Sequence, residues 1–250
     1  MGRYLNQGNE SFQKSVNSEI YVDKTGLIEY TNRVLNTQQG YVCISRPRRF
    51  GKSMAANMLT AYYSRGCDSE ELFSGFEISK SADFETYRNK YNTISLNMQE
   101  FLSRSNNIEE VIDRVKRFVL RDLKKAYSDV DYLDDMDLIE SMQDVYEEKK
   151  CPFVVIIDEW DCVIRNSDDQ NLIHNYLQFL HSLFKSEESK YFLALAYITG
   201  ILPIKKIKDE SALNNFQEFT MLKSRPITQY YGFTEEEVMM LCRQYNMDYE

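Results

Sequence analysis

The sequence predicts an α/β fold in which helices cover a central, mostly parallel β-sheet, and three observations lead to this class. Short β-rich segments alternate along the chain with segments of helical periodicity. Two of the β-rich segments, at 153–157 and 191–198, are apolar at nearly every position, which is typical of strands buried on both faces. A chain of 250 residues with 43% hydrophobic residues is also long enough to form a large core.

The elements follow one another in a strand-and-helix alternation. Asp23 is a plausible N-cap for a helix over 23–35, and a capping box formed by Thr234 and Glu237 predicts a helix at the C-terminal end. Apolar residues that recur every three or four positions predict a further amphipathic helix at 108–123. The remaining expected elements are strand 40–45, helix 52–64, strand 92–98, strand 153–157, helix 171–184 and strand 191–198.

Composition excludes several classes of protein. The formal net charge of −9 argues against a protein that coats nucleic acid, because phosphate neutralisation needs clustered cations. The longest apolar run, 191–202, is too short to span a membrane, and the N-terminus lacks the apolar stretch of a secretory signal. The 5 cysteines form no C-x-x-C pair, so we expect free thiols and a cytoplasmic location.

The most informative stretch is residues 46–53, which read R-P-R-R-F-G-K-S between a predicted strand and a predicted helix. The last three positions match the phosphate-loop pattern G-x-x-x-x-G-K-[ST], and Arg46 replaces the first glycine. Lys52 would place a charge on the β- and γ-phosphates, and the hydroxyl of Ser53 would ligate Mg²⁺. Backbone amides at a helix N-terminus bind anions, and here they belong to Arg48, Arg49, Phe50, Gly51, Lys52 and Ser53.

A second motif is formed by the strand at 153–157 and the two acidic residues that follow it, Asp158 and Glu159. An apolar strand followed by acidic residues has the form of a Walker B motif. The carboxylate of Asp158 is expected to hold Mg²⁺, and Glu159 to orient the attacking water, which favours hydrolysis of the nucleotide. We expect Asp161 to brace the loop or to pair with Arg48 or Arg49. Thr199, at the end of the strand at 191–198, is a candidate contact for the γ-phosphate or the water.

These residues resemble the bacterial AAA-ATPase-like family, which is related to the archaeal ATPases and the signal-transducing NTPases. The family's loop also lacks the leading glycine, and Trp160 stands where the family often has tyrosine. The resemblance rests on Y-V-D-K-T at 21–25, S-R-P-R-R-F-G-K-S at 45–53, I-I-D-E-W-D at 156–161, T-G-I-L at 199–202, L-N-N at 213–215 and Y-G-F-T-E-E-E at 231–237.

The resemblance implies a three-layer P-loop NTPase with an additional strand and the sheet order 5-1-4-3-2, in which the Thr199 strand lies between the strands of Lys52 and Asp158. It implies ATP and Mg²⁺ as ligands, with Asp23 and Lys24 on the adenine side. The expected organisation is an adenine-side segment at 1–38, a P-loop NTPase core at 39–226, and the start of a truncated helical lid at 227–250.

Family members usually continue into a nuclease-like domain of the PD-(D/E)XK class, which would be a partner of this region in a longer protein. Within these residues, E-x-K at 147–149 and at 188–190 is interpreted as solvated charge. A homo-oligomer is also compatible with the sequence. Arg165 and Arg225 are candidates for an arginine finger that acts in trans or from the lid, and nothing in the sequence chooses between them.

Two functional hypotheses remain open at this point. The first is Mg²⁺-dependent ATP binding and hydrolysis, and the second is a nucleotide-gated switch or adaptor with negligible turnover on its own. A kinase is disfavoured because Glu159 beside Asp158 favours water as the nucleophile. Direct nucleic-acid binding is disfavoured by the net charge.

Overall fold

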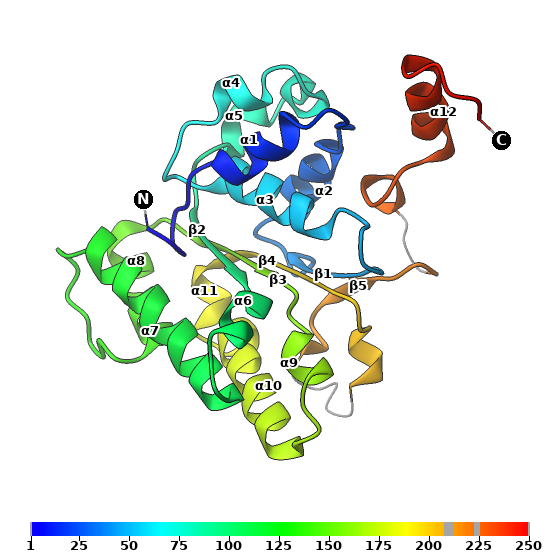
Figure 1. Cartoon of the computed structure of the whole chain (residues 1–250). Helices are drawn as coiled ribbons and strands as arrows, with labels where there is room; N and C mark the ends of the chain where they lie inside the picture. Colours follow the sequence, from blue (N-terminus) through cyan, green and yellow to red (C-terminus); the bar gives the residue numbers. More distant parts are fainter. Residues whose placement is uncertain (1, 208–212, 223–225, 250) are drawn as a thin grey trace.

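The computed structural model describes residues 2–207, 213–222 and 226–249 and has a five-stranded sheet in which every pair of strands is parallel (Figure 1). The strand order β2-β3-β4-β1-β5 confirms the predicted order 5-1-4-3-2 when read from the other edge. The strands are β1 (Tyr41–Ser45), β2 (Asn92–Asn97), β3 (Phe153–Asp158), β4 (Leu193–Gly200) and β5 (Gln217–Phe219).

Helices cover both faces of the sheet, so the fold has the three layers that the sequence predicts (Figure 1). One layer contains α1 (Glu10–Val16), α2 (Gly26–Val34), α3 (Lys52–Tyr63), α4 (Glu70–Phe73), η1 (Glu77–Lys80) and α5 (Phe84–Tyr87). The other contains α6 (Met98–Ser103), α7 (Ile108–Ala126), α8 (Leu138–Lys149), α9 (Cys162–Arg165), α10 (Gln170–Lys185), α11 (Ser189–Phe192) and η2 (Ile204–Lys206).

The side chains of each central strand pack in two separate hydrophobic cores, because successive side chains of a strand point to opposite faces of the sheet. In β1, Val42 and Ile44 pack in the core with α2 and α3, whereas Cys43 packs in the core with α7 and α10. In β3, Val154 and Val155 divide in the same way. This double burial is the reason why the central strands read as unbroken apolar runs.

Two elements begin two or three residues later than predicted. Helix α2 begins at Gly26, because the carboxylate of Asp23 accepts hydrogen bonds from the amides of Thr25 (2.8 Å) and Glu77 (2.7 Å) and does not cap the helix. The fourth strand begins at Leu193, because the preceding residues form the short helix α11. Apolar residues alone do not distinguish the last turn of a buried helix from the first residues of a buried strand.

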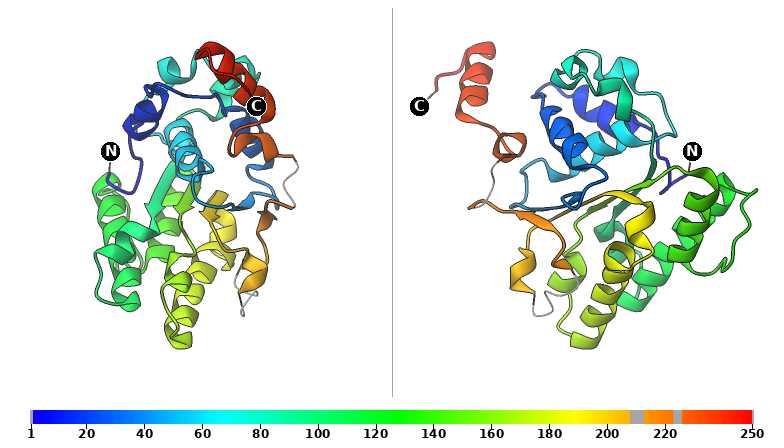
Figure 2. Two further views of the ribbon diagram at one scale, coloured as in Figure 1. Left: turned by 45° about the vertical axis from the view of Figure 1, so that its right-hand side comes forward. Right: turned by 180° about the vertical axis from the view of Figure 1, so that it is seen from behind.

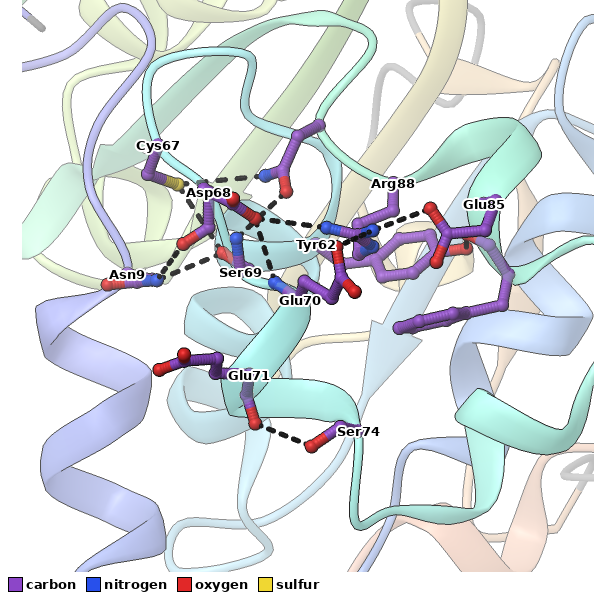
Figure 3. A network of polar contacts seen from close by, with 12 residues as sticks. Asn9, Tyr62, Cys67, Asp68, Ser69, Glu70, Glu71, Ser74, Glu85 and Arg88 are labelled. Atoms are coloured by element: carbon purple, nitrogen blue, oxygen red, sulfur yellow. Dashed lines mark hydrogen bonds and ion pairs between the residues drawn. The ribbon is translucent and has the colours of Figure 1, made fainter.

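A buried arginine braces the segment that follows α3 (Figure 3). The guanidinium of Arg88 pairs with Asp68 (3.1 Å), Glu70 (3.1 Å) and Glu85 (2.6 Å), and it lies over the ring of Phe84. Since the three carboxylates are largely exposed, each pair contributes little by itself. Together they fix α4 and α5 beside the end of α3.

The C-terminal segment, defined here as residues 226–249, contains η4 (Thr228–Tyr230) and α12 (Glu235–Gln244). Helix α12 stands off from the helix layers (Figures 1 and 2) and has no buried residue. Its predicted capping box between Thr234 and Glu237 is present. None of the helices in the described residues combines the length and the apolar character needed to cross a lipid bilayer.

Candidate functional site

The predicted functional residues come together at the carboxyl ends of β1, β3 and β4, where a parallel α/β sheet forms its binding crevice. Residue pairing in the sheet explains why they meet. Ser45 lies beside Gly200, and Ile157 lies beside Ile198, so the loops after the three strands leave the same edge.

The loop between β1 and α3 has the backbone of an anion-binding turn. Arg49 (φ 69°) and Gly51 (φ 75°) are both in the left-handed region, and such turns direct successive amides into one concavity. A Cβ on Gly51 would meet nothing within 4 Å, so the glycine is needed here for its backbone conformation. Helix α3 begins directly afterwards, and its N-terminus adds the favourable end of the helix dipole.

Lys52 is buried and folds back across the loop, where its Nζ donates to the carbonyl oxygens of Arg46 (3.1 Å) and Pro47 (3.0 Å). Burial lowers the pKa of this ammonium group, and nearby carboxylates oppose that shift, with Glu159 contributing most. A buried ammonium that is held by neutral carbonyl groups is suited to receive an anion.

Asp158 accepts hydrogen bonds from several polar side chains of the site. It accepts hydrogen bonds from the hydroxyl of Ser53 (2.5 Å), from the hydroxyl of Thr199 and from the amide of Asn97 (3.4 Å). Serine hydroxyl and aspartate carboxylate oxygens are hard ligands of the kind that Mg²⁺ prefers. The residues present therefore fit a magnesium ion, held by Ser53 and Asp158. Thr199 is fully buried, and its hydroxyl group is directed at Asp158.

Glu159 directly follows β3 and has a left-handed backbone (φ 55°). Its carboxylate accepts a 2.5 Å hydrogen bond from Nη2 of Arg165, and the same guanidinium binds Asp161 through Nε at 3.0 Å. The expectation that Asp161 pairs with Arg48 or Arg49 is wrong. Asp161 pairs instead with Arg165, which lies one helical turn away.

A comparison with protein families matches residues 7–208 to the AAA-ATPase-like family, described as "Predicted AAA-ATPase". The chain belongs to the AAA-ATPase-like family. The match includes the loop at 46–53, Asp158, Glu159 and Thr199, and it confirms the resemblance to this family that the sequence indicates. No curated protein matches the chain.

An apolar pocket adjoins the loop of this AAA-ATPase-like chain. It lies between the N-terminal residues, α3 and the C-terminal segment, and only the last of these falls outside the family match. Of the two residues expected on the adenine side, Lys24 lines the pocket, whereas Asp23 bonds to backbone amides. The lining residues are Phe12, Ile20, Tyr21, Val22, Lys24, Arg49, Phe50, Gly51, Met54, Ala55, Met58, Tyr230, Gly232 and Phe233.

The C-terminal segment is attached to this pocket by polar contacts that the sequence does not reveal. The amide of Gly232 donates to the carbonyl oxygen of Phe50 (3.2 Å) in the loop. Nζ of Lys24 pairs with both carboxylate oxygens of Glu237, at 2.5 and 2.6 Å, and donates to the carbonyl oxygen of Gln229. Glu237 therefore completes the capping box of α12 and also anchors that helix to the N-terminal residues.

We expect Glu237→Gln to loosen α12 without removing its N-cap, because glutamine also serves at this position of a capping box. The lost ion pair is partly buried and should be worth about 0.5–1 kcal/mol, which speeds hydrogen exchange of the α12 amides about 2- to 5-fold. The control is Glu236→Gln, an exposed glutamate on the same helix turn. Equal exchange in both variants would contradict a role for the Lys24 pair.

Several expected contacts are not found where the sequence places them. The side chains of Arg48 and Arg49 are exposed, and within the described residues neither forms an ion pair. Arg165 is engaged with carboxylates of its own chain, and Arg225 lies outside the described residues. Asn97 is a site residue that no sequence motif indicates. Its position at the end of the strand beside β3 is the signal that could have identified it.

Proposed function

We propose that this AAA-ATPase-like chain binds ATP with Mg²⁺ and hydrolyses it. The proposal rests on one observation: a buried lysine, a helix N-terminus and the Ser53–Asp158 oxygen pair lie at the same end of the sheet as the carboxylate of Glu159. When bound, Mg²⁺ would neutralise charge on the phosphate oxygens.

The chain's own residues have separate tasks in this proposal. Lys52 and the amides from Arg48 to Ser53 hold the triphosphate, and the apolar pocket beside Gly51 receives the base. Asp158 and Ser53 hold the metal, while Thr199 orients Asp158 by donating its hydroxyl proton.

Glu159 accepts a proton from the attacking water in this proposal. A positioned carboxylate is suited to that task, because general-base catalysis needs an acceptor within reach of the nucleophile. The leaving group is the β-phosphate of ADP, and the transferred phosphoryl group leaves as inorganic phosphate.

The test is to measure ATP binding by calorimetry and phosphate release, first with Mg²⁺ and then with excess EDTA. We expect measurable release with the metal, a loss of release in EDTA, and weaker binding because the phosphate charge is no longer shared with a cation. Binding and release that are both independent of the metal would contradict the proposed role of Ser53 and Asp158.

A second candidate function is a nucleotide-gated switch with negligible turnover on its own. Two contacts of the C-terminal segment favour this function. One is with Phe50 in the loop, and the other is with Lys24, which lines the pocket. A ligand between these groups would bias the position of α12 and of any domain that follows it, such as the nuclease-like domain expected from the family, or of a second copy. Tight ATP binding that protects α12 from hydrogen exchange, without phosphate release, would favour the switch.

A further inference from the structure

Arg165, at the end of α9, joins two acidic residues of the loop that follows β3. Its Nη2 donates to Glu159 at 2.5 Å, and its Nε donates to Asp161 at 3.0 Å. The side chain of Arg165 is 18% exposed, compared with 22% for Glu159 and 0% for Asp161. These ion pairs are therefore sheltered from water, where charge-assisted hydrogen bonds are strong and directional.

The Asp161 end of this bridge is rigid. Oδ2 of Asp161 also accepts the amides of Ile201 (2.9 Å) and Leu202 (2.7 Å), which follow β4. A Cβ at Gly200 would lie 2.8 Å from Oδ1 of Asp161, so the glycine permits this close approach. Since Asp161 is fixed by the backbone, the guanidinium that it binds is fixed as well.

The Glu159 end of the bridge acts electrostatically on Lys52, the first residue of α3. Among the carboxylates near Lys52, Glu159 has the largest electrostatic effect on the pKa of the ammonium group, larger than that of Asp158. Glu159 also has the strained backbone (φ 55°) that is found at functional positions. The guanidinium therefore holds a carboxylate whose charge acts on Lys52, the residue proposed to hold the phosphates.

The same contacts oppose the use of Arg165 by a neighbouring copy of the chain. To reach another subunit, the guanidinium would have to leave both carboxylates, and Asp161 would remain buried without its cation. Breaking a buried pair in this way is strongly unfavourable.

We propose that Arg165 is a positioning residue that fixes the Glu159 carboxylate, within one chain, for its action on the attacking water. This inference rests on the proposed hydrolysis. Arg165 then serves the site of the chain to which it belongs. Because Asp161 binds both Arg165 and the backbone amides after β4, the position of Glu159 depends on that backbone as well.

The test compares Arg165→Gln and Arg165→Lys with wild type, in single and double variants. Arg165→Gln should lower kcat about 10- to 100-fold through misplacement of Glu159, with KM and ATP affinity unchanged within about 2-fold. Arg165→Lys should restore part of kcat, because an ammonium group keeps one ion pair. In a Glu159→Gln background, Arg165→Gln should cause no further loss. The control is Arg114→Gln, because Arg114 pairs with Glu110 on α7 at a similar exposure and has no described contact with Glu159, Asp161 or Lys52.

Trp160 gives a second readout that does not need turnover. It is the only tryptophan of the chain and is buried between Glu159 and Asp161. Arg165→Gln and Glu159→Gln should increase acrylamide quenching of its fluorescence to the same extent, and the double variant should add nothing, whereas Arg114→Gln should have no effect.

Three results would overturn the inference. A further loss of kcat in the double variant would mean that Arg165 acts directly on the phosphates. Recovery of activity on mixing Arg165→Gln with Glu159→Gln would mean that the arginine is donated between copies. Unchanged quenching in both single variants would mean that the guanidinium does not hold Glu159. If the wild type releases no phosphate, the proposed hydrolysis fails on that result, while the quenching data still decide whether Arg165 holds Glu159.

Discussion

Glu159→Gln should lower phosphate release about 10²- to 10⁴-fold, which is the usual contribution of a positioned general base. Glutamine has nearly the same shape, but it loses the charge that pairs with Arg165 and it cannot accept a proton from water. ATP affinity should stay within about 3-fold of wild type, because Lys52, Ser53 and the loop amides are unchanged. Phosphate release and ATP titration on the same protein preparation separate the two effects.

The matched control is Glu147→Gln on α8, where the carboxylate is exposed and accepts a hydrogen bond only from Gln143 (2.8 Å) among its described contacts. It belongs to the E-x-K sequence at 147–149 and should leave release unchanged. Turnover of Glu159→Gln at the wild-type rate would show that another group accepts the proton, and equal losses in both variants would indicate a general effect of lost charge.

The sheet could be predicted because its signals are local and strong. The apolar run at 153–157 and the motif at 46–53 identify buried strands and the loops at their carboxyl ends. The family resemblance supplies the order 5-1-4-3-2, which the structure confirms. The short elements α4, α5, α9 and β5 could not be predicted, because segments of three or four residues carry too few positions for a periodic pattern.

The site is only partly visible in the sequence. The motifs identify Lys52, Ser53, Asp158 and Glu159, which the structure brings to one end of the sheet. The partners of these residues come from pairings that no motif encodes. Lys24 and Glu237 meet although they are 213 positions apart, and Thr199 reaches Asp158 only because β4 lies beside β3.

Arg165 shows the limit of the sequence in a different way. It lies only six positions from Glu159, and the sequence alone leaves it as one of two candidates for an arginine finger. What the sequence does not show is the left-handed backbone of Glu159 and the contact of its carboxylate with Arg165 on α9. Without these two features, neither the intramolecular pair nor its proposed role can be derived.

Lys52→Met should weaken ATP binding about 10- to 100-fold, which corresponds to the loss of hydrogen bonds to a charged group worth about 1.5–3 kcal/mol. Methionine keeps the length and the apolar stem of the side chain, so the buried position between the loop and α3 stays filled. Titration with ATP and Mg²⁺ measures the effect. The control is Lys190→Met, because Lys190 is exposed and pairs only with Glu187 among its described contacts.

The pH dependence of binding tests the same ammonium group without a mutation. Burial lowers the pKa of Lys52 below its usual 10.5, and a bound triphosphate favours the charged form and so raises that pKa. The contribution of Lys52 to ATP affinity is therefore complete below the lowered pKa of the free protein. It is lost as the pH rises from the pKa of Lys52 in the free protein to its higher pKa in the ATP-bound protein. Wild-type affinity should begin to fall at a pH below 10.5 and should approach that of Lys52→Met, whose affinity should not change over this range. Parallel pH curves for the two proteins would mean that the ammonium of Lys52 does not contact the phosphates.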